Sequence, residues 1–207
     1  MLPQTFEAIK LSSRKDSKVE YIIAYADKMK SRDHQTFKDI NDAVNNDEGV
    51  WLAGIRHRFN HLLRAGLISY HAEDYLNIHY AELDGTHQFS TQSNLFYALQ
   101  YIVQNSIGKD YGDDINTDAY GLRFVYSMSD WQWFFNYTDV DNNHTILSPW
   151  GGYAGYNSVQ INDFNRAGEE AIGLGVGYSF SSFGLKGLTA TVKYINGDTP
   201  DNGQIAS

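Results

Sequence analysis

Basic side chains recur on one parity of segments whose residues alternate between apolar and polar. Arg56 and Arg58 lie two residues apart and oppose Trp51 and Ile55 in parity, and Arg123 lies on the polar parity of its own segment. The residues with this placement are Lys10, Arg56, Arg58, Arg123 and Lys193. A guanidinium donates two parallel hydrogen bonds to a carboxylate, and a lysine ammonium attracts a carboxylate as a point charge. The pattern therefore predicts reversible binding of carboxylates at several points along one surface.

Other groups of reactive residues have weaker patterns. Ser69 and His71 form the nearest serine–histidine pair for a hydrolase, but they lie on one segment and no orienting residue accompanies them. His57 and His61 have a spacing that brings two metal ligands together only on a helix. Residues 139–143 begin like a calcium-binding loop but lack the glycine and glutamate that complete one. We therefore expect no catalytic residue, no metal and no cofactor.

The segments that would position the basic side chains are β-strands. Residues 130–138 show this best, because Trp131, Trp133 and Phe135 share one parity and Asn136 has the other. Successive residues of a strand point to opposite faces, so such a strand has one apolar and one polar face. Period-two alternation and turn residues predict ten strands. They cover residues 5–13, 19–28, 49–59, 63–73, 77–89, 94–104, 118–127, 131–140, 169–180 and 188–197.

The length and composition of these strands favour a wall that crosses a bilayer. Nearly all have the roughly 9–11 residues that a tilted transmembrane strand needs, and their apolar parity is rich in large aromatics. Short turns alternate with longer loops, as in bacterial outer-membrane barrels. No apolar run is long enough for a transmembrane helix. The sequence thus predicts an all-β chain, a transmembrane antiparallel β-barrel in the bacterial outer membrane, with lipid against the aromatic parity and basic residues toward the lumen.

Residues 141–168 form the longest predicted connection, and loops of this length are usually functional or disordered. Trp150, Tyr153 and Tyr156 predict that this loop folds back onto another surface. Two other classes stay open at this stage. One is an outer-membrane barrel hydrolase, and the other is a soluble β-rich carbohydrate-binding protein whose aromatic face packs inside.

Composition excludes further classes. The 207 residues include 25 acidic and 16 basic side chains, for a net charge of -9, and no contiguous basic stripe, so we expect no binding of nucleic acid. The absence of cysteine excludes disulfides and thiolate metal sites. The first residues have no basic region followed by an apolar stretch, and residues 204–207 form no closing strand. We therefore expect an internal piece of a longer protein.

Three sequence motifs resemble one protein family. Residues 2–7, Leu-Pro-Gln-Thr-Phe-Glu, resemble the LPQTFEG segment of the OprD family of outer-membrane porins. Residues 157–169 resemble that family's NSVQ-x-x-DFN-x-x-GE loop. Residues 184–189, followed by residues 194–198, resemble its GVPGLT…RYIRGD hairpin. The motifs occur in the family's order, and the resemblance covers essentially the whole chain.

The resemblance implies a fold and a function. It implies an eighteen-stranded monomeric barrel, of which residues 1–207 form one partial β-barrel domain from the middle and later part. It also implies a narrow, substrate-selective channel for small carboxylate-bearing solutes such as amino acids, peptides and aromatic acids. In that family a ladder of lumen Arg and Lys guides the carboxylate. The chain departs from the motifs at Lys186 and Asn196, where the family tends to have Pro and Arg.

The resemblance also implies a role for residues 141–168 as an extracellular loop that constricts the pore. Ser158, Asp163 and Arg166 are its candidate substrate-contacting residues, with Ser158 and Asp163 facing the cationic or polar end of the solute. Rings of basic residues make pores that accept anions, and their contacts must stay weak and multiple because a tightly bound solute cannot leave.

Overall fold

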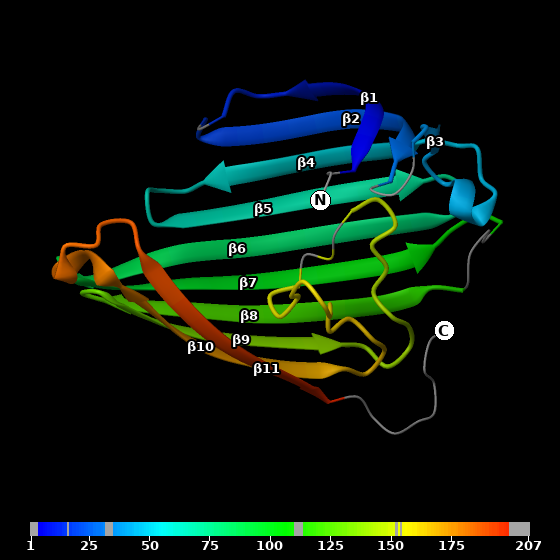
Figure 1. Cartoon of the computed structure of the whole chain (residues 1–207). Helices are drawn as coiled ribbons and strands as arrows, with labels where there is room; N and C mark the ends of the chain where they lie inside the picture. The colour runs from blue at the N-terminus through cyan, green and yellow to red at the C-terminus, as the bar shows by residue number, and fades with distance from the viewer. Residues whose placement is uncertain are drawn as a thin grey trace.

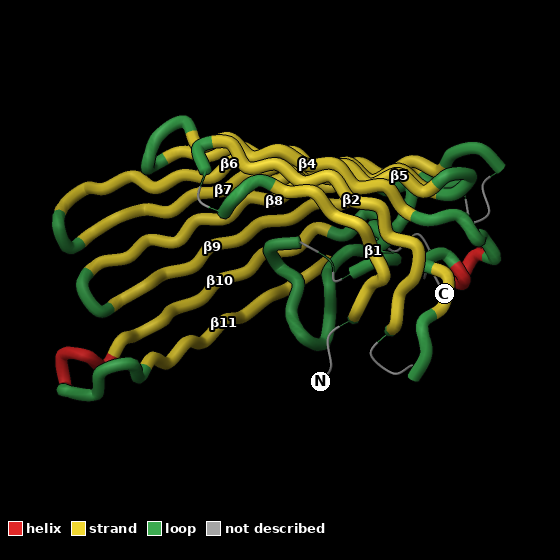
Figure 2. The backbone as a smooth tube through the Cα atoms, turned by 90° about the horizontal axis from the view of Figure 1, so that it is seen from above, coloured by secondary structure: helices red, strands yellow, loops and turns green. Residues whose placement is uncertain are grey.

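The ten predicted strands are all present and form one antiparallel sheet. The computed structural model describes residues 4–15, 17–31, 35–109, 114–151, 153 and 155–198. The strands are β1 (Thr5–Ser12), β2 (Val19–Lys30), β4 (Val50–Arg58), β5 (Leu63–Ala72), β6 (Leu76–Ser90), β7 (Ser93–Ser106), β8 (Asn116–Met128), β9 (Trp131–Val140), β10 (Glu170–Ser179) and β11 (Thr189–Asp198). Each pairs with the next in chain order, and a short β3 (Lys38–Asp39) pairs with β2. The sheet curves into a trough (Figures 1 and 2).

The convex face of the sheet is apolar and exposed. Ile9 is 81% exposed, Leu67 62% and Val192 70%, although all three lie within strands. Contiguous exposed apolar surface on this scale is unusual for a soluble monomer and is expected where a wall contacts lipid. The predicted aromatic parity is therefore the outward one.

Aromatic side chains on this face pack across neighbouring strands. Tyr126 and Trp133 lie opposite each other in register, with ring centroids 5.7 Å apart and nearly parallel. Trp131 contacts Trp133 along β9 and Tyr178 on β10, with centroids at 6.1 Å and 4.6 Å. Cross-strand aromatic pairs stabilise a sheet by about 0.5–1.5 kcal/mol each and fix its register.

The concave face is covered in part by the described residues of the loop 141–168, drawn yellow in Figure 1, which run inside the trough (Figures 1 and 2). Ile146 of this loop is 1% exposed and packs against Ile102, Ala119 and Val140 of the wall. A second buried cluster, near the segment between β2 and β4, contains Ile40, Val50, Ala72, Tyr75, Leu76 and Ile115. The loop thus contributes to buried contacts on the concave face, with Ile146 in one cluster and Leu147 and Trp150 packed against the other.

The connections contain two short 3-10 turns, η1 (Asp42–Val44) and η2 (Phe180–Phe183). Within the described residues, no helix is long and apolar enough to cross a membrane. Leu2 and Pro3 of the first sequence motif, and the terminal residues 204–207, lie outside the described part of the chain.

Candidate functional site

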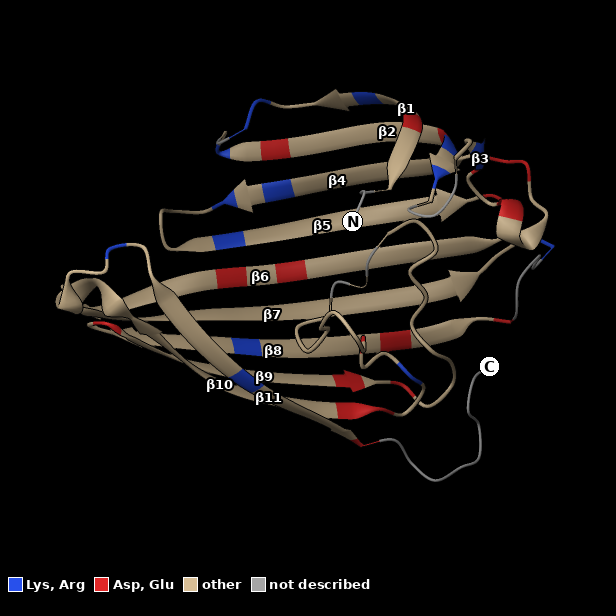
Figure 3. Cartoon of the chain, viewed as in Figure 1, with Lys and Arg blue, Asp and Glu red and all other residues tan. Residues whose placement is uncertain are grey.

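Charged residues recur on neighbouring strands of the wall (Figure 3), and the strand register places them in two adjacent rows. One row places Arg58, Arg64, Asp84, Ala98, Arg123 and Asn136 side by side on β4 to β9. The next row places Glu20, Arg56, Gly66, Glu82, Gln100 and Gly121 side by side on β2 to β8. We call these two sets the charged rows. They bring three of the predicted basic residues, Arg56, Arg58 and Arg123, onto one band of the wall.

Arg64 belongs to this band, although sequence patterning does not assign it to a face. Its Nε and one terminal guanidinium nitrogen donate to the same oxygen, Oδ2 of Asp84, at 2.9 and 2.7 Å. The Asp84 side chain is 8% exposed, whereas that of Arg64 is 42% exposed. The acidic members of the rows carry a sequence signal of their own, because Glu82 and Asp84 share the inward parity of β6.

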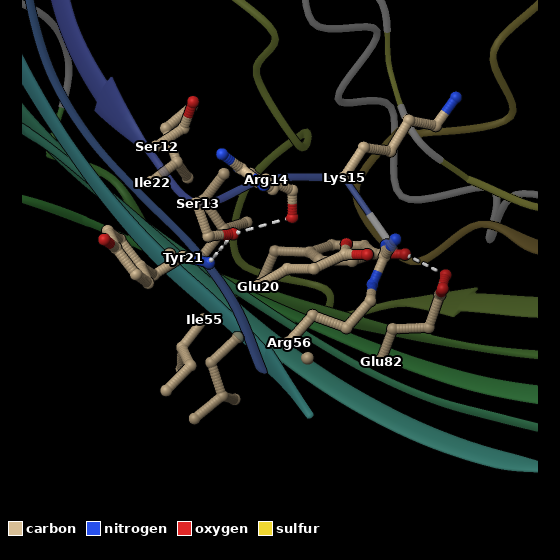
Figure 4. A pocket seen from close by; sticks show the side chains of 15 residues that line it. Ser12, Ser13, Arg14, Lys15, Glu20, Tyr21, Ile22, Ile55, Arg56 and Glu82 are labelled. Carbon is tan, nitrogen blue, oxygen red and sulfur yellow. Dashed lines mark hydrogen bonds between the residues drawn. The ribbon is translucent and has the colours of Figure 1, made fainter. Parts of the chain in front are cut away.

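Arg56 lies between two cavities on the concave face. One, of about 320 Å³, is lined by Arg56, Glu20, Tyr80 and Glu82 and by the β1–β2 turn, and Figure 4 shows Arg56 and Glu82 extending toward it. The other, of about 340 Å³, lies between the wall and residues 146–151 and Tyr153 of the loop and is also lined by Arg56 and Glu82. Arg56 makes no hydrogen bond or ion pair with the residues that the structure describes. Its guanidinium therefore keeps its full capacity to donate hydrogen bonds to a solute.

Glu82 is held by two tyrosines. Its Oε2 accepts hydrogen bonds from the hydroxyl of Tyr80 at 2.5 Å and from the hydroxyl of Tyr156 at 3.1 Å. Tyr80 belongs to the same strand, whereas Tyr156 belongs to the loop. One carboxylate of the wall thus orients a loop side chain beside the two cavities.

Of the other predicted basic residues, Arg58 lies in the charged rows, and Lys10 and Lys193 lie elsewhere on the concave face. Arg58 approaches Glu20 at 3.9 Å. Lys10 is in register with Ala24 on β2 and is exposed. Lys193 is exposed on β11, with its ammonium 4.6 Å from the ring centroid of Phe134. Lys10 on β1 and Lys193 on β11 thus extend positive charge along the wall beyond the charged rows.

Arg123 contacts the loop directly. Its Nε donates to Oδ1 of Asn136 at 3.3 Å, and a terminal nitrogen donates to the carbonyl oxygen of Tyr156 at 3.1 Å. Its guanidinium carbon also lies 4.2 Å from the centroid of the Tyr156 ring. Arg123 differs from Arg56 in this respect, because its donors are engaged within the protein.

The loop is attached to the rest of the protein at several described residues, including Leu147 and Trp150. Gln104, 1% exposed, donates to the carbonyl of Leu147 at 2.7 Å and accepts from its N–H at 2.8 Å. Trp150 donates from Nε1 to Oδ1 of Asn41 at 2.8 Å and stacks on Tyr70, with ring centroids 5.9 Å apart. These contacts confirm the prediction that the aromatic residues of this loop fold back onto another surface.

Two tyrosines of the loop are shielded from solvent where the loop packs against the wall. Burial raises the pKa of Tyr153 to about 12. Burial, assisted by the Glu82 carboxylate, also raises the pKa of Tyr156. Both hydroxyls are therefore protonated at neutral pH, and that of Tyr156 is a donor to Glu82.

The predicted loop residues lie on its more exposed part. The hydroxyl of Ser158 donates to Oδ1 of Asp163 at 2.6 Å, so these two side chains form a polar pair. Nε of Arg166 lies 3.7 Å from Oε2 of Glu169, which is buried at the end of the loop. The structure thus joins Ser158 to Asp163 and places Arg166 apart from them, beside Glu169.

The groups weighed for other chemistry are arranged differently. The hydroxyl of Ser69 lies 2.9 Å from Nδ1 of His79 on the next strand and does not pair with His71, whose Nδ1 lies 2.7 Å from Oδ1 of Asn77. Ser69 and His71, the nearest serine–histidine grouping in the sequence, are therefore not paired, because cross-strand neighbours on one face lie closer than residues two apart on one strand. Within the described residues, no three His, Asp or Glu side chains gather as a metal site.

The sequence matches the family described as outer membrane porin, OprD family, over residues 1–207. The chain belongs to this family. It is 27% identical to Porin D of Pseudomonas aeruginosa strain PAO1 over 158 residues, which cover 72% of this chain and 36% of that protein. OprD-family porins are proteins of the Gram-negative outer membrane, so the apolar convex face is the lipid-facing wall of a β-barrel.

Solved structures have the same fold. Pseudomonas aeruginosa OpdL superposes with a TM-score of 0.87 at 20% identity, covering 98% of this chain and 57% of that one. Pseudomonas aeruginosa OpdK, in a structure with vanillate, superposes at 0.86 with 22% identity, covering 95% and 53%. Acinetobacter baumannii OccAB2 gives 0.84 at 20% identity, covering 95% and 51%. The chain spans about half the length of these porins and about a third of Porin D.

Proposed function

We propose that the protein is a passive, substrate-selective channel for small carboxylate-bearing solutes, such as amino acids, peptides and aromatic acids, and not an enzyme. The observation that carries the proposal is Arg56. It lines the two cavities described above and makes no hydrogen bond or ion pair with the described residues. A guanidinium with free donors beside a low-dielectric wall attracts and orients carboxylates.

The other basic residues support passage from site to site. Arg58 lies in the charged rows, and Lys10 and Lys193 extend positive charge beyond them. Several moderate sites let a solute move on, whereas one strong site would trap it. Membership in a porin family and the vanillate bound to OpdK, an aromatic carboxylate, agree with this substrate class. We further propose that the barrel is monomeric and that residues 141–168 are the extracellular loop that constricts the pore, with Ser158, Asp163 and Arg166 available to passing solutes.

Planar-bilayer recording on the complete natural protein under a salt gradient tests the proposal. The solutes are an aliphatic amino acid, a dipeptide and a benzoate-type acid. We expect small steps that prefer anions and are blocked by one of these carboxylates, with block weakened by about tenfold or more in Arg56→Ala, since a charge-assisted hydrogen bond contributes about 1.5–3 kcal/mol.

Lys186→Ala is the matched control, because it removes one positive charge from an exposed turn. Equal loss of block in both variants would show that only total charge matters. Large unselective conductance steps would show that the protein is a channel without selective carboxylate sites. The absence of any channel would refute the proposed function.

A further inference from the structure

The loop meets the wall most tightly at two consecutive residues, Tyr156 and Asn157. They are 7% and 1% exposed, although they lie in a connection between strands. Nδ2 of Asn157 donates to Oγ1 of Thr138 at 3.0 Å and to the carbonyl oxygen of Ala171 at 2.8 Å. The carbonyl oxygen of Tyr156 accepts from Nδ2 of Asn136 at 2.9 Å.

The wall is shaped to receive these two residues. A Cβ on Gly173 would collide with Oδ1 of Asn157, and a Cβ on Gly121 would lie 3.2 Å from Cδ2 of Tyr156. Both glycines lie within strands, where glycine costs stability relative to residues with side chains. Their use here is the close approach of the loop. Gly121 and Gly173, together with Asn136 and Thr138 between them, form what we call the notch.

We infer that Tyr156 and Asn157 are a latch that holds residues 141–168 in the notch, and that Arg123 is a positioning residue of this latch. Arg123 reaches both sides of the contact, because its guanidinium donates to Asn136 of the wall and to the Tyr156 carbonyl of the loop. Tyr156 also donates to Glu82, which ties the latch to the charged rows. Its consequence for pore width rests on the proposed function.

The latch gives Arg123 a role that differs from that of Arg56. A carboxylate site needs positive charge, which lysine also supplies. The latch needs the planar fork of arginine, because two acceptors on different segments are bound at once. Arg123→Lys therefore keeps the charge and loses the latch geometry, and Arg56→Lys is the matched change at a residue outside the latch.

The test measures how often the loop detaches from the wall, by the rate at which a thiol beneath it is labelled, and does not depend on channel conductance. The chain has no cysteine, so a single Ala119→Cys substitution gives one thiol, at a wall position that is 1% exposed and packed beneath Ile146. A membrane-impermeant maleimide is applied to outer-membrane vesicles containing the complete protein. A Ser158→Cys variant shows that the reagent reaches the loop, and heat-modifiable migration on gels shows that each variant is folded.

In this background we expect Asn157→Ala, Gly173→Ala and Arg123→Lys each to raise the labelling rate by about tenfold, since each removes or displaces buried hydrogen bonds that hold the loop down. Gly177→Ala is the control on the same face of β10, because a Cβ there meets its nearest atoms at 3.3 and 3.4 Å only. Arg56→Lys should label like the parent.

Unchanged labelling in the folded Asn157→Ala and Gly173→Ala variants would overturn the latch. Faster labelling in those two but not in Arg123→Lys would overturn the role of Arg123. Faster labelling in all three, accompanied by larger or noisier single-channel steps, supports the latch and the constriction together. Faster labelling with unchanged steps would uphold the latch and overturn the constricting role assigned to the loop.

Discussion

The substitution Asp84→Asn tests two properties of the charged rows: whether their ion pairs stabilise the fold, and whether ions pass along them. Asp84 is a nearly buried carboxylate that accepts two hydrogen bonds from Arg64 at 2.7 and 2.9 Å. The asparagine keeps an oxygen at this position and removes the charge. Hydrogen bonds to charged groups contribute about 1.5–3 kcal/mol and neutral ones about 0.5–1.5 kcal/mol, so two bonds lose about 2–3 kcal/mol between them. Because the Arg64 side chain is 42% exposed and water can solvate it, we expect a loss below this range, about 1–2 kcal/mol.

The assay is urea unfolding of the complete protein refolded in detergent, with the reversal potential in a salt gradient as a second reading. Asp47→Asn removes the same charge from an exposed loop residue and is the control. Asp84→Asn should lower the free energy of unfolding and shift the reversal potential further toward anions, because one negative charge leaves the band while its four arginines remain. An unfolding free energy equal to that of Asp47→Asn would refute the structural role. An unchanged reversal potential would show that ions do not pass along these rows.

Three further predictions concern the loop. Gln104→Leu should leave the N–H and carbonyl of Leu147 without their partner, and hydrogen exchange at that amide should accelerate at least about tenfold, in contrast to the amides of the strand interiors. Trp150→Phe keeps an aromatic ring near Tyr70 but removes the donor to Asn41, and should cost about 1–2 kcal/mol in urea unfolding, whereas no loss would show that water replaces the indole. The pKa of Tyr156 is higher in the folded protein than its ordinary value of 10, so the protonated hydroxyl favours the folded state. This contribution is fully present below pH 10 and is lost as the pH rises from 10 toward the raised pKa. Thermal stability should therefore fall above pH 10, and less steeply in Tyr156→Phe; equal slopes would remove Tyr156 as the cause.

The strands of this porin could be predicted because their outward parity has a single environment. Lipid requires apolar side chains at every second position, so alternation persists even where the other parity varies. Each predicted strand ends within about three residues of the observed one, which is the usual uncertainty for element boundaries. The inward parity of Arg56, Arg58 and Arg123 followed from the same reasoning.

Arg64 could not be placed because the inward parity of β5 is not uniformly polar. Ile68 and Tyr70 face the trough on this strand, where they line the cavity beneath the loop. A wall covered by a loop behaves as a protein core, so apolar residues occur on both faces and the alternation disappears. The path of the loop was not predictable for a related reason, since it depends on contacts between distant residues, such as the 109 positions that separate Asn41 from Trp150.

The number of basic residues on the concave face overstates the number available to a solute. Arg64 is bound to Asp84 and Arg123 to the loop, so their donors are satisfied before any carboxylate arrives. Arg56 keeps its donors, although it lies in the row next to them and has the same side chain. The difference arises from the neighbours in register. Gly66 lies beside Arg56 on β5 and offers no side chain, and Glu20, its neighbour on β2, approaches Arg58 instead, whereas Asp84 lies beside Arg64 and accepts its hydrogen bonds. Selectivity in such a wall therefore depends on which arginines the acidic residues and the loop leave unpaired, and a single Gly→Asp exchange beside Arg56 would be enough to remove a site without removing a positive charge.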